Sequence, residues 1–512
     1  MRSRLWKTIA AVYLIAAMLL VLLPQSAGAE TVYAENLSKQ CKYTGDFSVH
    51  ADRLRDNDFD TAQRVNKGKT LSIQWTDAVP VASVYLSFYS APVAYTVMQF
   101  DGSGNPLSEE PGVLLYNNLI EPLPDTRKVS IRADADDCSL CALHAYGAGE
   151  IKDYHPFAPT VEKTDYMTFA MHPDDDVLFL GAVYPLYDAD RGLTGVSMIM
   201  STKLPEKFQR QRRQEDLNSS WVLGLKTQPV FGGFPDIPQD YYDKFHHTFT
   251  KDDVTRYAVA QIRKYRPEVV VTQDLNGEYG HWQHKVLAEG VLAAVPLAAD
   301  PDYQPKGYPQ SEPWEVKKLY IHLYGENTLT LDVNRPIEAL NGKSAFESAT
   351  EAFQCHETQI KKDNHRVSTT EYSIAEFGLA YTTVGLDTPG VNDMFEHVDP
   401  YALSVTPTPE PTPEPTPEPT PEPTPSPEPT EAPTVPPTAE PTAAPTPAPI
   451  VADAEVETPA PTEVPTPAPV PADPPEAADP GLPTGTILLI GGGLILLLAA
   501  LVVLLLIVRK RR

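Results

Sequence analysis

Two short stretches of the sequence hold residues that could carry out metal-dependent hydrolysis. The first is His-Pro-Asp-Asp-Asp at residues 172–176, which directly follows an apolar run at 166–171. The second contains His281 and His284 and follows the apolar run 269–272. In open α/β sheets, functional groups gather at the carboxyl ends of the strands, so these two loops could converge at one edge.

Convergence of His172, Asp175 and His284 would place two imidazoles and one carboxylate around a single point. Such a set leaves an open position for water, which is typical of catalytic zinc sites, although iron would suit the same ligands. The consecutive acids can then have separate tasks. Asp175 would bind the metal, and Asp174 would act as the general base toward a water molecule that the metal activates. A bound cation would also offset the mutual repulsion of these carboxylates.

The same residues have a purely structural interpretation. Residues 172–176 could begin a helix, where acidic side chains interact favourably with the helix dipole. His281 and His284 could be surface histidines. The position of both stretches directly after apolar strands favours the metal site over this alternative.

The segment 160–400 is predicted to fold as an α/β domain with a Rossmann-like, mostly parallel sheet. Helical spacing of apolar residues covers 254–265 and ends before Pro267. Apolar runs typical of buried strands lie at 166–171, 193–200, 269–272 and 316–323. Strands that alternate with helices indicate this class of fold.

Both chemical stretches resemble motifs of the PIG-L/LmbE-like zinc de-N-acetylases. That family has Ala-His-Pro-Asp-Asp-Glu after a strand and, later, Gly-His-Pro-Asp-His. This chain has Met-His-Pro-Asp-Asp-Asp at 171–176 and Gly-His-Trp-Gln-His at 280–284. Three further segments are similar to family text in the same order, at 212–225, 265–270 and 352–359. The resemblance therefore covers most of the predicted α/β domain.

The resemblance implies a role for each matching residue. His172, Asp175 and His284 match the metal ligands of the family, and Asp174 matches its general base. His281 matches the residue that, when protonated, assists the tetrahedral intermediate. The implied cofactor is Zn²⁺, and the implied reaction is removal of an N-acetyl group from an N-acetylglucosamine-type sugar.

Further residues near the motifs are expected to contact the substrate. Tyr279 falls where some members use a tyrosine near the oxyanion, and Arg212 and Arg213 are expected to line the substrate pocket. The chain departs from the family by Asp176 in place of glutamate and by Trp282, which could stack on a sugar or simply pack in the core. The acid beside His284 is also missing, so another group must orient His281.

Residues 30–150 are predicted to form a β-sandwich. Period-two alternation occurs at 70–75 and 82–88, and a turn signal lies at 101–104. The layout loosely resembles a discoidin-like (galactose-binding-like) module, which would imply glycan or surface binding. A spacer without a ligand is the alternative.

Both ends of the chain are predicted to lie outside the folded part. Residues 1–29 have a basic start, an apolar run and a small-residue cleavage site, typical of a signal peptide, although an uncleaved anchor is the alternative. Residues 487–508 carry no charge and are long enough for one transmembrane helix. The basic tail 509–512 predicts a cytoplasmic C-terminus.

The segment 406–482 consists of Pro-Thr-Pro-Glu repeats and looser Pro/Ala/Thr sequence. Such a composition predicts a disordered, extended stalk. The Leu-Pro-Thr-Gly at 482–485 resembles a sortase signal that lacks one residue, so a plain membrane anchor is favoured. We therefore expect a single-pass protein of the cell membrane with its ectodomain outside, on a bacterial surface.

The net charge of −27 at pH 7 argues against nucleic acid as a partner, because an acidic surface repels an anionic polymer. An oxidising compartment would allow disulfides among Cys41, Cys138, Cys141 and Cys355, in more than one pairing. A bridge from Cys41 to Cys138 or Cys141 would join the ends of the first module. A zinc site at the Cys-Ser-Leu-Cys stretch would need a second such pair, which the sequence lacks.

These observations together favour a cell-surface, zinc-dependent de-N-acetylase that acts on an N-acetylated sugar or a surface glycan. One alternative is a non-catalytic glycan-binding protein with a degenerate hydrolase domain. Another is a zinc amidase whose N-acyl substrate is not a sugar.

Overall fold

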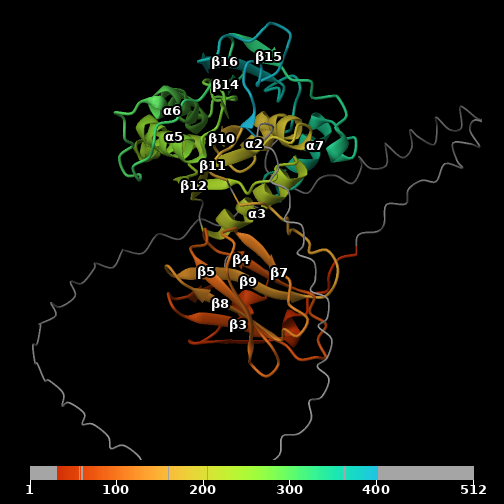
Figure 1. Cartoon of the computed structure of the whole chain (residues 1–512). Coiled ribbons are helices and arrows are strands. Elements are labelled where there is room, and N and C mark those ends of the chain that lie inside the picture. Colours follow the sequence, from red (N-terminus) through yellow and green to blue (C-terminus); the bar gives the residue numbers. More distant parts are fainter. Residues whose placement is uncertain are drawn as a thin grey trace, which may run out of the picture. The chain divides into compact units, whose positions relative to one another are not determined.

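The computed structural model describes residues 32–56, 58, 61–159, 161–203, 206–360 and 365–401 (Figure 1). The predicted signal peptide (1–29), stalk (406–482), transmembrane helix (487–508) and basic tail (509–512) lie outside the described residues. Within the described ranges, no helix combines the length and the apolar character that a membrane span needs.

The N-terminal module consists of two antiparallel sheets, as the period-two pattern predicts. Their strand orders are β1-β3-β8-β5-β6 and β2-β9-β4-β7. Alternate residues of β3 and β8, such as Leu71, Ile73, Val129 and Ile131, point into one apolar core and are fully buried. The strands are β1 (Lys42–Gly45), β2 (Gln63–Val65), β3 (Thr70–Gln74), β4 (Ser83–Phe88), β5 (Tyr95–Phe100), β6 (Pro106–Pro111), β7 (Asn117–Ile120), β8 (Lys128–Ala133) and β9 (Cys138–Tyr146).

The four cysteines are free thiols, so the predicted bridge from Cys41 to Cys138 or Cys141 is not formed. The Sγ atom of Cys41 instead donates to the carbonyl oxygen of Leu37 at 3.5 Å. Cys138 and Cys141 both lie on β9, and because they are three residues apart they point to opposite faces of that strand. Burial raises the pKa of the Cys41 and Cys138 thiols to about 11.

The α/β domain is built on a seven-stranded sheet with the order β12-β11-β10-β13-β14-β16-β15. The first five strands are parallel, and β16 pairs antiparallel with both β14 and β15. The mostly parallel α/β prediction is therefore confirmed. The strands are β10 (Tyr166–Ala170), β11 (Gly195–Lys203), β12 (Val230–Pro235), β13 (Val269–Thr272), β14 (Lys318–His322), β15 (Thr328–Thr330) and β16 (Glu376–Thr382).

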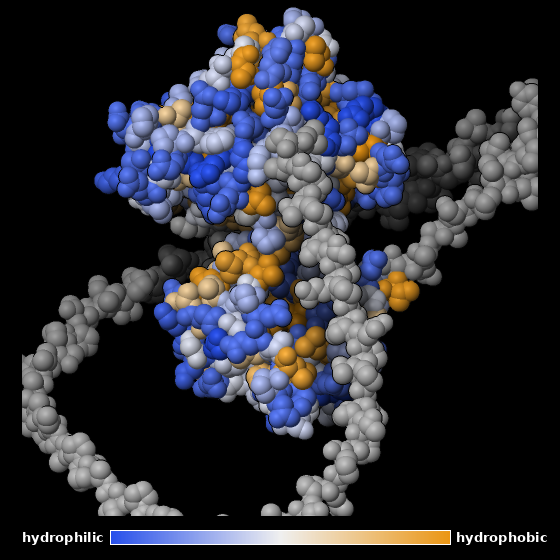
Figure 2. Space-filling view, viewed as in Figure 1, coloured by the Kyte–Doolittle hydropathy of each residue, from blue (hydrophilic) through white to orange (hydrophobic). Residues whose placement is uncertain are grey.

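Helices cover both faces of this sheet (Figure 1). Tyr166 and Ala170 of β10 point to the face covered by α2 and α7, whereas Met167 and Phe169 point to the face covered by α5 and α6. The visible surface of the domain is mostly hydrophilic (Figure 2). The helices are α2 (Asp175–Leu180), α3 (Glu206–Val222), α4 (Tyr242–Phe245), α5 (Lys251–Tyr265), α6 (Trp282–Ala299), α7 (Ala345–Phe353) and α8 (Glu357–Ile360), with 3-10 turns η4 (Gln239–Tyr241) and η5 (His246–Thr248).

The position of α6 matters because its first turn carries the second chemical motif. Helix α5 begins with a capping box between Thr250 and Asp253, in which each side chain bonds the other residue's backbone N–H. Helices α5 and α6 then pack so closely that a Cβ atom on Gly290 would lie 2.4 Å from a methyl carbon of Val254. Glycine at this position thus allows α6 to lie against α5, with its N-terminus at the edge of the sheet.

Candidate metal-dependent active site

The two motifs lie at the carboxyl ends of β10 and β13, which are neighbouring parallel strands with Phe169 opposite Thr272. The loops that follow are joined directly, because the backbone N–H of Met171 donates to Oε1 of Gln273 at 2.7 Å. Helix α2 begins within the first motif and α6 within the second. The fold thus brings together the two loops that the sequence pattern predicts to converge.

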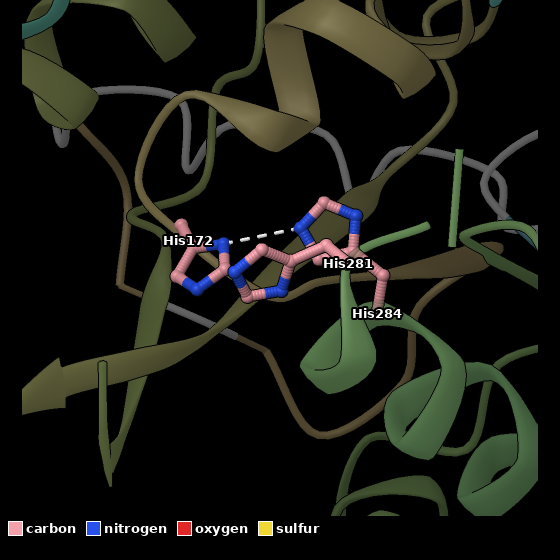
Figure 3. A group of neighbouring side chains, drawn as sticks. All are labelled: His172, His281 and His284. Carbon is pink, nitrogen blue, oxygen red and sulfur yellow. Dashed lines mark hydrogen bonds between the residues drawn. The ribbon is translucent and has the colours of Figure 1, made fainter. Parts of the chain in front are cut away.

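His172, Asp175 and His284 meet at this edge with one atom each (Figure 3 shows the two histidines). Nδ1 of His172 lies 2.8 Å from Oδ2 of Asp175, Nε2 of His284 lies 3.1 Å from the same oxygen, and the two ring nitrogens are 3.2 Å apart. Ligands bonded to zinc at ~2.0–2.1 Å in a tetrahedron lie about 3.3 Å from one another. The triangle therefore has nearly the size of one face of a zinc site.

The outer nitrogens of both rings face hydrogen-bond acceptors. The inner nitrogens, which face each other and Asp175, are therefore left to bind a metal ion. Nδ1 of His284 contacts Oε2 of Glu278 at 2.7 Å. Nε2 of His172 faces Oε1 of Gln283 at 3.4 Å and Oδ1 of Asp236 at 3.6 Å. With hydrogens on these outer nitrogens, two lone pairs and a carboxylate oxygen point at one another. A cation between them removes this repulsion, so the donor set fits a metal ion.

The acids around the site raise the pKa of both candidate histidine ligands. Burial alone would lower the pKa of His284, but the charges and hydrogen bonds of Asp175 and Glu278 raise it to about 10. The same opposition acts at His172, where Asp236 and Asp175 outweigh burial and raise the pKa. Because a metal binds only the deprotonated imidazole, its binding would release these protons.

A second possible triad replaces Asp175 with His281. One ring nitrogen from each of His172, His281 and His284 lies within 4.8 Å of the others (Figure 3). His281 is the N-cap of α6, and its Nδ1 accepts the backbone N–H of Gln283 at 3.3 Å. The Asp175 oxygen lies closer to the other two ligand atoms, so we assign Asp175 as the third ligand and His281 as a neighbour.

Glu278 is the group that orients His284, and sequence reasoning did not assign it. Its carboxylate is fully buried and accepts from Nδ1 of His284 and, at 3.0 Å, from Nδ1 of His322. Burial alone would raise the pKa of Glu278, but the hydrogen bonds from the two histidines hold it below its ordinary value. Glu278 thus supplies a carboxylate–histidine contact to His284, whereas the group expected to orient His281 in place of the missing acid is not Glu278.

We expect Glu278→Gln to weaken metal binding about 10–100-fold, because the neutral amide no longer supports His284 as a basic ligand. Competition for the metal with a chelator of known affinity would measure the loss. Glu289→Gln, at an exposed position of α6, is the matched control and should bind metal like the parent. Parent affinity in Glu278→Gln would contradict the orienting role.

Asp174 lies beside the triad in a strained backbone conformation. Its φ of 138° lies in the left-handed region that non-glycine residues rarely adopt, and such residues cluster at functional sites. Its Oδ1 accepts a hydrogen bond from Nη2 of Arg212 at 2.5 Å. Burial raises the pKa of Asp174 to about 7, although Arg212 opposes the shift. A carboxylate with a pKa near the working pH is suited to general base catalysis.

Arg212 holds this carboxylate with a network that the sequence did not reveal. Its guanidinium also donates to the carbonyl oxygen of Pro173 at 2.7 Å and to Oδ2 of Asp236 at 3.1 Å. Asp236, just after β12, therefore connects Arg212 to Nε2 of His172. Arg212 lies at the site, where it was expected to line the substrate pocket. Its hydrogen bonds, however, are made to neighbouring residues of the site.

Comparisons with known proteins agree with this geometry. Residues 167–295 match the family model "PIG-L: GlcNAc-PI de-N-acetylase", and the match includes both motifs. The chain carries a PIG-L domain. A protein named 1D-myo-inositol 2-acetamido-2-deoxy-alpha-D-glucopyranoside deacetylase 2, from Saccharopolyspora erythraea, is 32% identical over 174 residues, which are 29% of this chain and 61% of the relative.

Two further matches show how much of the chain the similarity covers. A protein named deacetylase 1 for the same glycoside, from Catenulispora acidiphila, is 28% identical over 220 residues, 38% of this chain and 66% of the relative. The structure of an N,N'-diacetylchitobiose deacetylase from Pyrococcus horikoshii is 18% identical with a TM-score of 0.27, over 38% of this chain and 71% of that one. The chain thus spans less than two thirds of the length of the two curated relatives.

Arg213 does not line the substrate pocket of the PIG-L domain, contrary to the prediction. Its guanidinium donates to the carbonyl oxygens of Phe88 at 2.7 Å and Tyr89 at 2.9 Å, and lies 4.1 Å from the ring centroid of Tyr116. All three contact residues belong to the N-terminal module. Successive residues of a helix point about 100° apart, so Arg212 faces the site while Arg213 faces the module.

Trp282 packs in the core and does not offer its face to a sugar. It is 5% exposed, and its ring meets Tyr242 and Phe249 edge to face at 5.4 and 6.0 Å. Tyr279 lies beside the candidate site, so its predicted place near the oxyanion stays a prediction. It is 42% exposed, and its ring centroid is 5.8 Å from that of His281.

Asp176, which replaces the glutamate of the family motif, is fully buried. Neither of its oxygens has a hydrogen-bond partner among the described residues. Burial, reinforced by the charge of Asp174, raises its pKa to about 8. The third acid of the motif is therefore a buried neighbour of Asp175 whose environment favours its neutral form.

Proposed function

We propose that the protein is a zinc-dependent hydrolase that removes acetyl groups from N-acetylglucosamine-type sugars or glycans. The observation that carries the proposal is the meeting of His172, Asp175 and His284 beside a buried Asp174 within a PIG-L domain. Relatives named as deacetylases of an acetamido sugar support this choice of substrate. Zinc is favoured because two imidazoles and one carboxylate with an open position suit it.

The residues of the chain divide the reaction among them. Zinc, when bound, would supply Lewis-acid activation of water and of the acetamide carbonyl. Asp174 would take the proton of the attacking water and then return it to the amine that leaves with the sugar. Arg212 holds the Asp174 carboxylate in position. Tyr279 would contribute its hydroxyl to the oxyanion from the mouth of the site.

His281 would assist the tetrahedral intermediate as a neutral donor, which differs from the protonated form that the family resemblance implies. Burial, the largest cause, lowers the pKa of His281 below its ordinary value and so favours the neutral ring. Because its Nδ1 accepts from the backbone of Gln283, the remaining proton lies on Nε2. The Nε2–H group would therefore donate to the oxyanion without a second proton on the ring.

The proposed location is the outer face of a cell membrane. This part of the proposal rests on the sequence patterns of a signal peptide at 1–29, a stalk at 406–482 and an apolar segment at 487–508. A stalked enzyme outside the membrane would meet glycans of the wall or surroundings. We therefore propose that the substrate is a glycan outside the cell and not a small metabolite of the cytosol.

The test is turnover by the purified zinc-loaded protein, measured as release of primary amine and acetate from chitin oligomers and from N-acetylated peptides. Release from the oligomers is the expected result. Release only from the peptides would replace the sugar by another N-acyl substrate. Binding of glycans without turnover of either would favour a non-catalytic glycan-binding protein.

A further inference from the structure

The segment from Asp236 to Phe249 connects the metal site with the protein surface. At its start, Oδ1 of Asp236 faces Nε2 of His172, and the backbone N–H of Ile237 donates to Oε1 of Gln283 at 2.8 Å. At its end, Phe249 is fully buried in the core. The short helices η4, α4 and η5 lie between these two fixed points.

Three aromatic side chains of this segment, Tyr241, Tyr242 and His246, form what we call the aromatic ledge. Tyr241 is 52% exposed, Tyr242 is 45% exposed, and His246 is exposed as well. The Tyr242 ring stacks on His246 with centroids 5.0 Å apart and planes 28° apart. The Tyr242 ring also meets the ring of the buried Trp282 edge to face, with centroids 5.4 Å apart.

The ledge is held rigidly next to the catalytic motif. Trp282 directly follows His281 in the chain, and its backbone N–H donates to Oε1 of Gln239 at 3.1 Å, within the ledge segment. Tyr242 therefore rests on a residue whose neighbours on both sides belong to the site. Single exposed aromatic residues are common, but adjacent rings fixed in place beside a catalytic centre are typical of a binding surface.

We infer that the aromatic ledge binds sugar rings that neighbour the acetylated unit, so that the preferred substrate is an oligomeric N-acetylglucosamine glycan. This inference rests on the proposed function and deepens it. Sugar rings present apolar C–H faces that can lie on tyrosine rings, and a ring that is already fixed loses little conformational entropy on binding. A monosaccharide has no neighbouring sugar ring to place on such a surface.

The charge of the segment limits which class of glycan it could bind. Asp240 and Asp243 are exposed on it and only Lys244 opposes them, apart from the histidines. A neutral glycan fits this surface better than an anionic polymer does. Units that have already lost their acetyl group carry an ammonium group, and these would also be attracted.

The experiment compares steady-state deacetylation of N-acetylglucosamine and its β-1,4 oligomers of two, four and six units by the full zinc-loaded protein. We expect kcat/KM of the parent to rise about tenfold or more from the monomer to the tetramer. Tyr242→Ala should lose about tenfold in kcat/KM on the tetramer, mainly through KM, and least on the monomer. Tyr242→Phe should behave as the parent, because the ring face is kept. Tyr33→Ala removes a tyrosine of the other module that is 62% exposed and is the control.

Two kinetic outcomes would overturn the inference. Equal losses at every oligomer length would mean that Tyr242 supports the site itself, and the absence of any loss would mean that the ledge binds nothing. Should the parent turn over none of the oligomers, the proposed function fails, and calorimetric titration of the tetramer still tests the ledge. Binding that Tyr242→Ala weakens about tenfold would support it, and no binding or an unchanged affinity would overturn it.

Discussion

His284→Ala is expected to leave the protein without its metal ion and to lower deacetylase activity by roughly 10³-fold or more. The imidazole would supply one of three protein ligands, and the side chain is fully buried, so its removal leaves an incomplete site. The variant also leaves the Glu278 carboxylate with one histidine partner, His322, in place of two. Elemental analysis of the purified protein and amine release from an acetylated chitin oligomer would measure both effects.

The same two measurements on three further variants identify the third ligand. Asp175→Ala should lose the metal as completely as His284→Ala does. His281→Ala should keep about one metal ion per chain and lose activity, because its Nδ1 caps α6 and only its Nε2–H faces the reaction. His50→Ala, at an exposed histidine of the N-terminal module, should match the parent in both respects. Metal loss in His281→Ala with retention in Asp175→Ala would instead assign the ion to the three histidines.

The sequence predicted the ligands because they lie on a fixed local pattern. Each motif directly follows a buried strand, and parallel strands end at the same edge of the sheet, so spacing alone places His172 near His284. Glu278 lies in the quoted second motif, but its role depends on a left-handed turn at the residue itself, with φ of 47°, that aims the carboxylate back at His284. The sequence around Glu278 contains no pattern that predicts this turn. It also contains no pattern that predicts the contact between Asp236 and His172, which lie on different loops.

The errors at Arg213 and Trp282 have a common physical cause. Arg213 follows Arg212 within α3, and Trp282, the first residue of α6, follows its N-cap His281. A helix turns by about 100° per residue, so the next side chain along the chain points away from the site. Arg213 then meets the carbonyl groups of the N-terminal module, and Trp282 meets the core beneath the ledge. Without a structure, the sequence does not show which of two neighbours faces inward.

Asp174→Asn is expected to lower kcat by about 10²–10⁴-fold while the protein keeps its metal. The amide has the shape of the carboxylate, and its oxygen can still accept the hydrogen bond from Arg212, so the strained turn at residue 174 should persist. It cannot, however, take a proton from water. The main loss should therefore appear in kcat, with normal metal content and little change in thermal stability.

The pH profile separates a base from a residue that merely holds the site together. Burial raises the pKa of Asp174 from 3.8 to about 7, and only the deprotonated form can accept a proton. In the parent, kcat/KM should fall as the pH drops through this pKa, which a bound cation would move below 7. The Asp174→Asn variant should lack this acidic limb, and Asp302→Asn, at an exposed aspartate, should keep it. Substantial activity with an unchanged acidic limb in Asp174→Asn would move the role of base to Asp236, which faces both Arg212 and His172.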